Sequence, residues 1–341
     1  MRCRPRAYAL RLVLTSLLIT SVALASQTAP SFNAQITHAG NILRARPGEA
    51  TFQSPDRFAV DSQGNVVVLD RGLNKVTKLS PAAKVLWNAG GTPLVPKRFD
   101  LLEDVVIDTQ DQVWVLNGGN NSLCIFAADG HFLRTIPLQR YPRRFVINSL
   151  GEIIANPAVG PHLFDVYSAD GKYLRSFGKR EKYANDTTES ELNTGNLVAG
   201  PQGEVYISLV YPPVIRSYDS RGNLRWEVPI PFTPPLKKPD IKTQAESNGQ
   251  ISAVFDYQVA SLDLSLDGQG RLLCLAAGLP ATQVKIGTSR MDVFSPKGQH
   301  LGSVKLPVAA MRMATHWRDL FLLRASSQDI SLDRYSLGSA G

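Results

Sequence analysis

Residues Pro55 to Trp87 read PDRFAVDSQGNVVVLDRGLNKVTKLSPAAKVLW, and this stretch predicts four short strands. An apolar run from Phe58 to Val60 precedes a polar turn, and the β-branched run Val66 to Leu69 follows that turn. A polar loop, an alternating segment from Lys75 to Leu79, a second turn and a final apolar segment complete the stretch. This order of short strands and Gly/Asn/Asp turns is typical of a four-stranded antiparallel meander.

The same pattern returns five more times along the chain, and one residue of the first turn and one of the last turn mark each copy. The first markers are Gly64, Asp111, Gly151, Gly203, Gly270 and Asp319. The second markers are Ala83, Gly130, Gly171, Gly222, Gly298 and Gly338. A four-stranded sheet has two faces to bury, so six copies predict sheets packed face to face around an axis. We expect an all-β fold, a six-bladed β-propeller of four-stranded antiparallel blades.

The expected propeller covers residues 26–341, with blades at about 54–90, 99–138, 141–178, 193–230, 260–306 and 308–336. The sixth copy is too short to supply its own outer strand. Residues 32–37 alternate between apolar and polar side chains, as a half-buried strand does. We expect this N-terminal strand to complete the last blade and remove its open edge.

Residues 1–25 differ from the rest of the chain. Four arginines precede an apolar run from Leu12 to Leu24, and the segment ends in Ala23-Leu24-Ala25. This pattern predicts a secretory signal peptide cleaved after Ala25, and a protein exported to the periplasm or the extracellular space. The alternative is an uncleaved membrane anchor, but the apolar run is short for a membrane-spanning helix. We expect no stable membrane insertion after cleavage.

Charge and cysteine content exclude some classes of protein. The formal net charge is +8, and it falls to +4 when the four arginines of residues 1–25 are removed. No dense run of Lys and Arg remains, so we expect no nucleic-acid partner. Cys124 and Cys274 lie in predicted strands of blades three apart, too distant for a disulfide, so we expect two buried thiols.

The string PDRFAVDSQGNVVVLDRGLNKVTKLS, residues 55–80, resembles an NHL repeat. Six such copies make the chain similar to secreted bacterial six-bladed propellers of the NHL and related families. The similarity is strongest in the first blade and weakens toward the sixth. Relatives of this kind include protein-binding scaffolds, a peptide-amidating lyase domain and calcium-dependent lactonases, so the resemblance implies a shape and leaves the function open.

The length variation falls on connections that we assign to one face of the ring, the top face. The long connections are Lys179 to Asn196, Pro229 to Ala260 and Ala276 to Arg290. Loops on a rigid scaffold often bind ligands, although long insertions are also well tolerated at such places. The proline-rich segment Pro229 to Asp240 is expected to run extended, as a lid or as a spacer.

Known catalytic and metal-binding motifs are missing from the sequence. There is no G-x-S-x-G elbow, phosphate-binding loop, H-E-x-x-H motif or EF-hand loop. Of the five histidines, only His162 is expected on the top face. We therefore assign no catalytic residue and expect no metal site and no cofactor.

Alignment on the first marker predicts two layers of core residues on the innermost strands. Six residues before the marker come Phe58, Val105, Phe145, Leu197, Leu264 and Met313. Four residues before it come Val60, Ile107, Ile147, Ala199, Leu266 and Thr315, which we call the lower layer.

The candidate binding site is a third set, seven residues before each first marker, which we call the ring residues. They are Arg57, Asp104, Arg144, Asn196, Asp263 and Arg312. All six should lie at the top ends of the innermost strands, at the mouth of the central channel. In one interpretation they are solvent-exposed ion pairs, Arg57 with Asp104 and Asp263 with Arg312.

In the other interpretation the three ring arginines, together with Arg140 and Arg143, outnumber the aspartates and form a positive funnel. Such a funnel would bind a carboxylate or phosphate group, and Arg144 is the residue that we expect to make the main contact.

Together these features predict an exported, non-catalytic propeller that binds a protein partner or an anionic small ligand through its top-face loops and channel mouth. The alternative is a propeller lyase or lactonase-type hydrolase with a divalent cation, calcium, in the channel. A third possibility is a subunit of a larger envelope complex.

Overall fold

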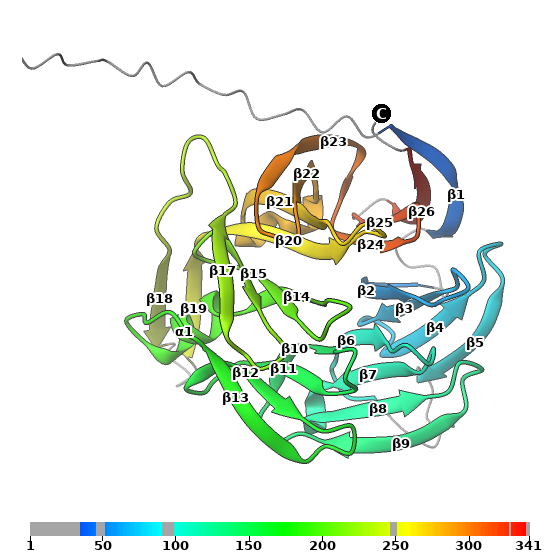
Figure 1. Ribbon diagram of the computed structural model, residues 1–341, viewed down its shortest axis with the longest axis horizontal. Helices are drawn as coiled ribbons and strands as arrows, with labels where there is room; N and C mark the ends of the chain where they lie inside the picture. Colours follow the sequence, from blue (N-terminus) through cyan, green and yellow to red (C-terminus); the bar gives the residue numbers. More distant parts are fainter. Residues whose placement is uncertain (1–34, 46–51, 91–98, 246–250, 327–328, 339–341) are drawn as a thin grey trace, which may run out of the picture.

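The computed structural model describes residues 35–45, 52–90, 99–245, 251–326 and 329–338. These residues form six four-stranded antiparallel sheets arranged in a ring (Figure 1). The first strands of the sheets, β2, β6, β10, β14, β20 and β24, contact one another in ring order and surround the central channel. The all-β, six-bladed propeller is confirmed. Residues 1–25, the expected signal peptide, lie outside the described residues.

The first three blades are regular. Blade one consists of β2 (Pro55–Val60), β3 (Val66–Asp70), β4 (Lys75–Leu79) and β5 (Val85–Gly90). Blade two consists of β6 (Leu102–Ile107), β7 (Val113–Asn117), the 3-10 turn η1 (Gly118–Asn120), β8 (Ser122–Phe126) and β9 (Phe132–Pro137). Blade three consists of β10 (Pro142–Ile147), β11 (Ile153–Pro157), β12 (His162–Tyr167) and β13 (Tyr173–Lys179).

The last three blades carry the longer connections. The helix α1 (Asp186–Leu192) precedes blade four, which consists of β14 (Gly195–Ala199), β15 (Val205–Leu209), β16 (Val214–Tyr218) and β17 (Leu224–Pro229). Blade five consists of β20 (Gln258–Leu266), β21 (Leu272–Pro280), the 3-10 helix η2 (Ala281–Ile286), β22 (Thr288–Phe294) and β23 (His300–Ala310). Blade six consists of β24 (Arg312–His316), β25 (Asp319–Ala325), β26 (Ile330–Leu337) and β1 (Ile36–Ala45).

The closing strand is N-terminal, as predicted, but it extends further along the chain, to Ala45. β1 pairs antiparallel with β26 from Ile36 opposite Leu337 to Ala45 opposite Ile330. The prediction placed this strand at residues 32–37, of which residues 32–34 lie outside the described residues. Ile42 and Leu43 are buried side chains of β1, and they pack in the core cluster between blades six and one.

The connection between blades four and five also differs from the expectation. Its second half is a hairpin of β18 (Asp240–Ala245) and β19 (Ile251–Asp256), which the sequence did not predict. Its proline-rich first half has no regular structure but is fixed to blade five. Arg290 donates from Nη2 to the carbonyl oxygen of Pro231 at 2.6 Å and stacks over the ring of Phe232. This half is therefore part of the folded body.

The first turns owe their shape to an acceptor side chain at their start. Asp61 Oδ1 accepts hydrogen bonds from the backbone N–H groups of Gln63 and Asn65, and Asp108, Asn148 and Asp267 repeat this arrangement. Blades four and six are exceptions. In blade four Gly200 starts the turn, and the backbone N–H of Gln202 donates to Oε2 of Glu204 instead. In blade six Asp319 begins β25 and the residue with positive φ is Trp317, at 56°.

The second-marker glycines allow close contact between neighbouring blades, in addition to forming the turn. A Cβ atom on Gly130 would lie 2.6 Å from Cγ of Trp87 in the preceding blade, and one on Gly222 would lie 2.5 Å from Cγ of Phe177. Both glycines also have positive φ. The outermost strands can therefore pack closely only where the next blade's turn lacks a side chain.

Side chains between neighbouring blades form the core. In the first predicted layer Leu197 is half-buried and the other five residues are buried. The lower layer is half-buried, because its side chains also face the channel. Cys124 and Cys274 are buried and form no disulfide with each other, as expected. In the described part of the chain, no helix is long and apolar enough to cross a bilayer.

Candidate functional site

The six ring residues come together at the centre of the propeller. All of them line one cavity of about 370 Å³, and each comes from a different innermost strand. The cavity extends from the ring residues to the lower layer. The residues one position closer to the top face, such as Asp56 and Glu103, do not line it. The ring residues therefore form its upper end.

Irregular pairing of the innermost strands helps to place these side chains. The register shifts between Pro55 and Arg57 in β2, and β6 and β10 shift at the equivalent point just before Asp104 and Arg144. A bulge of this kind redirects side chains and is common beside functional sites. Here it brings two consecutive residues of a strand, such as Asp56 and Arg57, into the polar network at the channel mouth.

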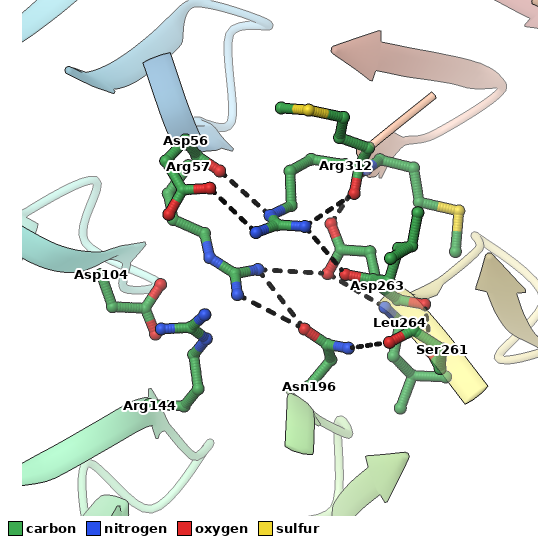
Figure 2. A network of polar contacts seen from close by, with 12 residues as sticks. Asp56, Arg57, Asp104, Arg144, Asn196, Ser261, Asp263, Leu264 and Arg312 are labelled. Atoms are coloured by element: carbon green, nitrogen blue, oxygen red, sulfur yellow. Dashed lines mark hydrogen bonds and ion pairs between the residues drawn. The ribbon is translucent and has the colours of Figure 1, made fainter. Parts of the chain in front are cut away.

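Arg57 reaches across the channel from blade one to blades four and five (Figure 2). Its Nη1 and Nη2 lie 3.4 and 3.5 Å from Oδ1 of Asn196, and its Nη1 lies 3.7 Å from Oδ1 of Asp263. The predicted pairing of Arg57 with Asp104 is wrong, because the long arginine side chain crosses the channel to the carboxylate of Asp263 in blade five.

Arg312 pairs with Asp56, which the sequence analysis did not single out. Its Nη2 donates to Asp56 Oδ1 at 2.9 Å, and its Nε donates to the carbonyl oxygen of the same residue at 3.0 Å. The expected pair of Arg312 with Asp263 is not formed; both oxygens of Asp263 accept backbone N–H groups, from Leu264 and Met313. Burial opposes ionisation of Asp56, but Arg312, Arg57 and other nearby guanidinium groups hold its pKa well below the usual range.

A second polar group lies beside the ring and was also missed. Arg71 forms ion pairs with Asp56 and Glu103, and the hydroxyl of Tyr141 donates to Glu103 Oε1 at 2.6 Å. Burial, with Glu103 adding to it, raises the pKa of Tyr141 to about 12. The sequence feature that could have indicated this group is the acidic residue directly before the ring residue in blades one and two, Asp56 and Glu103.

Arg144 is the ring cation with the weakest internal pairing. Its Nη1 donates to the carbonyl oxygens of Arg143, at 2.6 Å, and Glu103, at 3.4 Å. Its buried Nε has no hydrogen-bond partner, and among the residues that the structure describes no carboxylate lies within 4 Å of its guanidinium. Burial, with Arg57 adding to it, lowers the pKa of Arg144 to about 9.

Asp104 lies beside Arg144 in Figure 2 without a direct bond to it. Its oxygens accept the backbone N–H groups of Val105, at 3.1 Å, and Phe145, at 3.4 Å. Burial raises its pKa, against the opposing effect of the Arg144 and Arg57 guanidinium groups. This half of the ring therefore holds a cation and a carboxylate that are both incompletely compensated.

Arg140 and Arg143 do not line the cavity. Arg140 Nη1 lies 2.7 Å from both carboxylate oxygens of Asp165, and Arg143 Nη2 donates to Glu191 Oε1 in α1 at 2.6 Å. At the mouth itself, three arginines face three aspartates, with Asp56 as the third. The expected excess of positive charge is therefore absent among the described residues, and the charges at the mouth balance.

The mouth offers no metal site of the usual kind. Within residues 35–45, 52–90, 99–245, 251–326 and 329–338, no group of three or more His, Cys, Asp or Glu side chains could hold a metal ion. Asp56 and Asp263 are bound to arginines or backbone N–H groups, and no histidine lines the cavity. These residues do not fit the oxygen-rich shell that calcium requires.

No family model matches the sequence. Among curated proteins, the chain is 33% identical over 81 residues to NHL repeat-containing protein 3 of Mus musculus, and 31% identical over 81 residues to the Homo sapiens protein. Each match covers 23% of this chain and 23% of the relative. The chain thus spans about a quarter of the length of these relatives.

Solved structures with the same fold cover most of the chain. Virginiamycin B lyase from Staphylococcus aureus superposes with a TM-score of 0.51 and 11% identity, over 88% of this chain and 99% of that one. A gluconolactonase from Xanthomonas campestris superposes with a TM-score of 0.52 and 16% identity, over 91% of this chain and 99% of that one. At these identities the similarity concerns the fold.

Proposed function

The chain is a six-bladed β-propeller of NHL-type repeats, and we propose that it is an exported, non-catalytic binding protein. Its channel mouth takes an anionic group, a carboxylate or a phosphate, from a small ligand or from a protein partner. The top-face connections, with α1, the β18–β19 hairpin and η2, supply the remaining contact surface. Propellers commonly bind ligands and partners through such connections.

The observation that carries this proposal is the state of Arg144. Its guanidinium lines the cavity, bonds only to backbone carbonyl oxygens and keeps a buried Nε without a partner among the described residues. A half-buried cation with so few partners is stabilised by an anion that completes its hydrogen bonds. A carboxylate or phosphate oxygen would do so through charge-assisted hydrogen bonds.

Export is supported by the basic and apolar pattern of residues 1–25. The proposal places the mature protein in the periplasm or outside the cell. Cleavage after Ala25 is testable by N-terminal sequencing of protein recovered from the envelope fraction; retention of residues 1–25 in that fraction would contradict it.

The alternative function is that of a lyase or lactonase-type hydrolase, which the lyase and gluconolactonase neighbours bring into consideration. Those similarities are limited to the fold. The mouth of this channel carries arginines and hydrogen-bonded aspartates, whereas a calcium site would need free oxygen ligands. A calcium-dependent rise in melting temperature, reversed by a chelator, would favour the enzyme.

The binding proposal is tested with acetate and inorganic phosphate as probes, by calorimetry at constant ionic strength. We expect Arg144→Gln to weaken binding of whichever anion binds by at least about tenfold, because a charge-assisted hydrogen bond is lost. Arg221→Gln is the matched control, since Arg221 is an exposed arginine in the last turn of blade four. Equal affinities for the native protein and Arg144→Gln would overturn the proposal.

A further inference from the structure

The cavity below the ring residues has a different character from the mouth. Its walls include the lower layer, in which five of six residues are apolar: Val60, Ile107, Ile147, Ala199, Leu266 and Thr315. Each of these side chains is half-buried, so each keeps some surface directed at the channel. The side chains of the cavity are therefore polar at its upper end and mainly apolar below it.

The strand positions between the two levels extend the apolar wall. Five apolar residues at this level line the cavity, with Ser265 in the equivalent place in blade five: Ala59, Val106, Val146, Val198 and Ala314. Phe58 and Phe145 of the buried layer line it as well. Among the lining residues, every side chain that carries a charge belongs to the ring. A ligand that enters the channel can therefore make ionic contacts with side chains only at its upper end, while most side chains below it offer dispersion contacts.

We infer that the ligand is an amphipathic monocarboxylate, with its carboxylate at Arg144 and an unbranched apolar chain in the channel below. This inference rests on the proposed function and narrows it to a class of ligand. Removal of the apolar chain and of the exposed parts of the lower layer from water supplies binding energy that an inorganic anion lacks.

The charge balance at the mouth favours a single negative charge. Three arginines already face three aspartates there, and Asp104 lies next to Arg144. A monocarboxylate needs one incompletely paired guanidinium, which Arg144 provides. A phosphate dianion would bring a second charge toward Asp104 without a second free cation to receive it.

The size of the cavity also limits the class. A volume of about 370 Å³ lies at the lower end of the range for small-molecule sites. It suits a chain of medium length, whereas a folded partner could contact only the surface around the mouth.

The first experiment uses the native protein and the straight-chain carboxylates from acetate to decanoate. We expect the Kd to fall about three- to fourfold with each added methylene, until the cavity is filled. The straight-chain alcohols of the same lengths should bind more weakly than the acids throughout. A Kd independent of chain length, or equal for acids and alcohols, would overturn the inference.

Two variants separate the two ends of the site. Ala199→Phe puts a large ring into the lower layer; it should remove the gain from added methylenes while acetate still binds. Arg144→Gln should abolish the preference for acid over alcohol and keep the dependence on length. Leu224→Phe, at an exposed position of β17, is the matched control for the added ring.

The outcomes distinguish this inference from the proposed function. Acetate and phosphate binding that depends on Arg144, without any dependence on chain length, would overturn the amphipathic ligand alone. Absence of anion binding by the native protein would overturn both.

Discussion

Lys78 and Asp61 form an ion pair inside blade one, with Nζ of the lysine 2.8 Å from Oδ2 of the aspartate. Both side chains are almost completely buried, at 3% and 2% exposure. Lys78 also donates to the carbonyl oxygen of Ala128, in a turn of blade two, at 2.9 Å. The pair therefore fixes the first turn of one blade and connects it to the next.

Replacement of Lys78 by Met should strongly destabilise the protein, because it leaves the Asp61 carboxylate buried without its cation. Loss of one partner of a buried pair costs about 3–5 kcal/mol. Urea unfolding followed by circular dichroism measures the change, with Lys84→Met, in an exposed turn, as the control. Equal stabilities of the two variants would contradict this view of the pair.

The same pair predicts a dependence of stability on pH. Burial opposes ionisation of Asp61, but hydrogen bonds from Lys78, Asn65 and the turn backbone lower its pKa. A carboxyl group with a lowered folded-state pKa stabilises the fold above its unfolded pKa of about 4, and this stabilisation is lost as the pH falls through the folded value. The difference in unfolding free energy between native protein and Asp61→Asn should therefore shrink on acidification below pH 4. A constant difference from pH 7 to pH 3 would contradict it.

Gly222→Ala should destabilise the protein far more than Gly151→Ala. Both glycines have positive φ, so each substitution carries backbone strain of about 1–2 kcal/mol. A Cβ at Gly151 meets no atom within 4 Å, whereas one at Gly222 would overlap the ring of Phe177. Thermal unfolding of the two variants isolates the cost of the blade contact. Similar melting temperatures would show that Phe177 moves aside freely.

Asp104→Asn should strengthen anion binding at neutral pH by roughly five- to tenfold, because it removes a negative charge beside Arg144. The amide oxygen can still accept the Val105 N–H bond. In the native protein, anion affinity should rise as the pH falls through the raised pKa of Asp104, and the variant should lose this rise. An alkyl sulfate is a suitable probe because its own charge stays constant. An unchanged affinity would show that Asp104 does not face the bound anion.

Deletion of residues 35–45 should lower the melting temperature substantially, because it removes β1, exposes the edge of β26 and uncovers the core around Leu43. Thermal unfolding followed by circular dichroism provides the measurement. A melting temperature close to that of the full chain would mean that blade six is stable with three strands.

The ring residues were predictable because the turn that follows the innermost strand has nearly the same length in each blade. Counting back from Gly64 or Gly151 therefore reaches the same level of the channel. The role of Asp56 was not predictable in this way. It depends on the register shift between Pro55 and Arg57, which the residue pattern of the strand does not predict.

The pairing of the ring residues and the extent of β1 also required the structure. Whether Arg57 contacts a neighbour or reaches Asp263 depends on the diameter of the channel relative to the length of an arginine side chain. In β1, register shifts between His38 and Gly40 and between Asn41 and Leu43 interrupt the alternation of apolar and polar residues. A search for alternating apolar and polar residues therefore misses most of this strand.

The pairing of β1 with β26 has a consequence for the time course of folding. Asn41 and its partner Asp333 are 292 residues apart, so a chain that emerges N-terminus first must leave its first strand without a partner until nearly every other residue has been delivered. Contacts this distant in sequence form slowly, and an unpaired strand edge is open to association with other chains while it waits. We therefore expect ring closure to come late in folding, and the unpaired edge of β26 to be most open to aggregation in the interval before it.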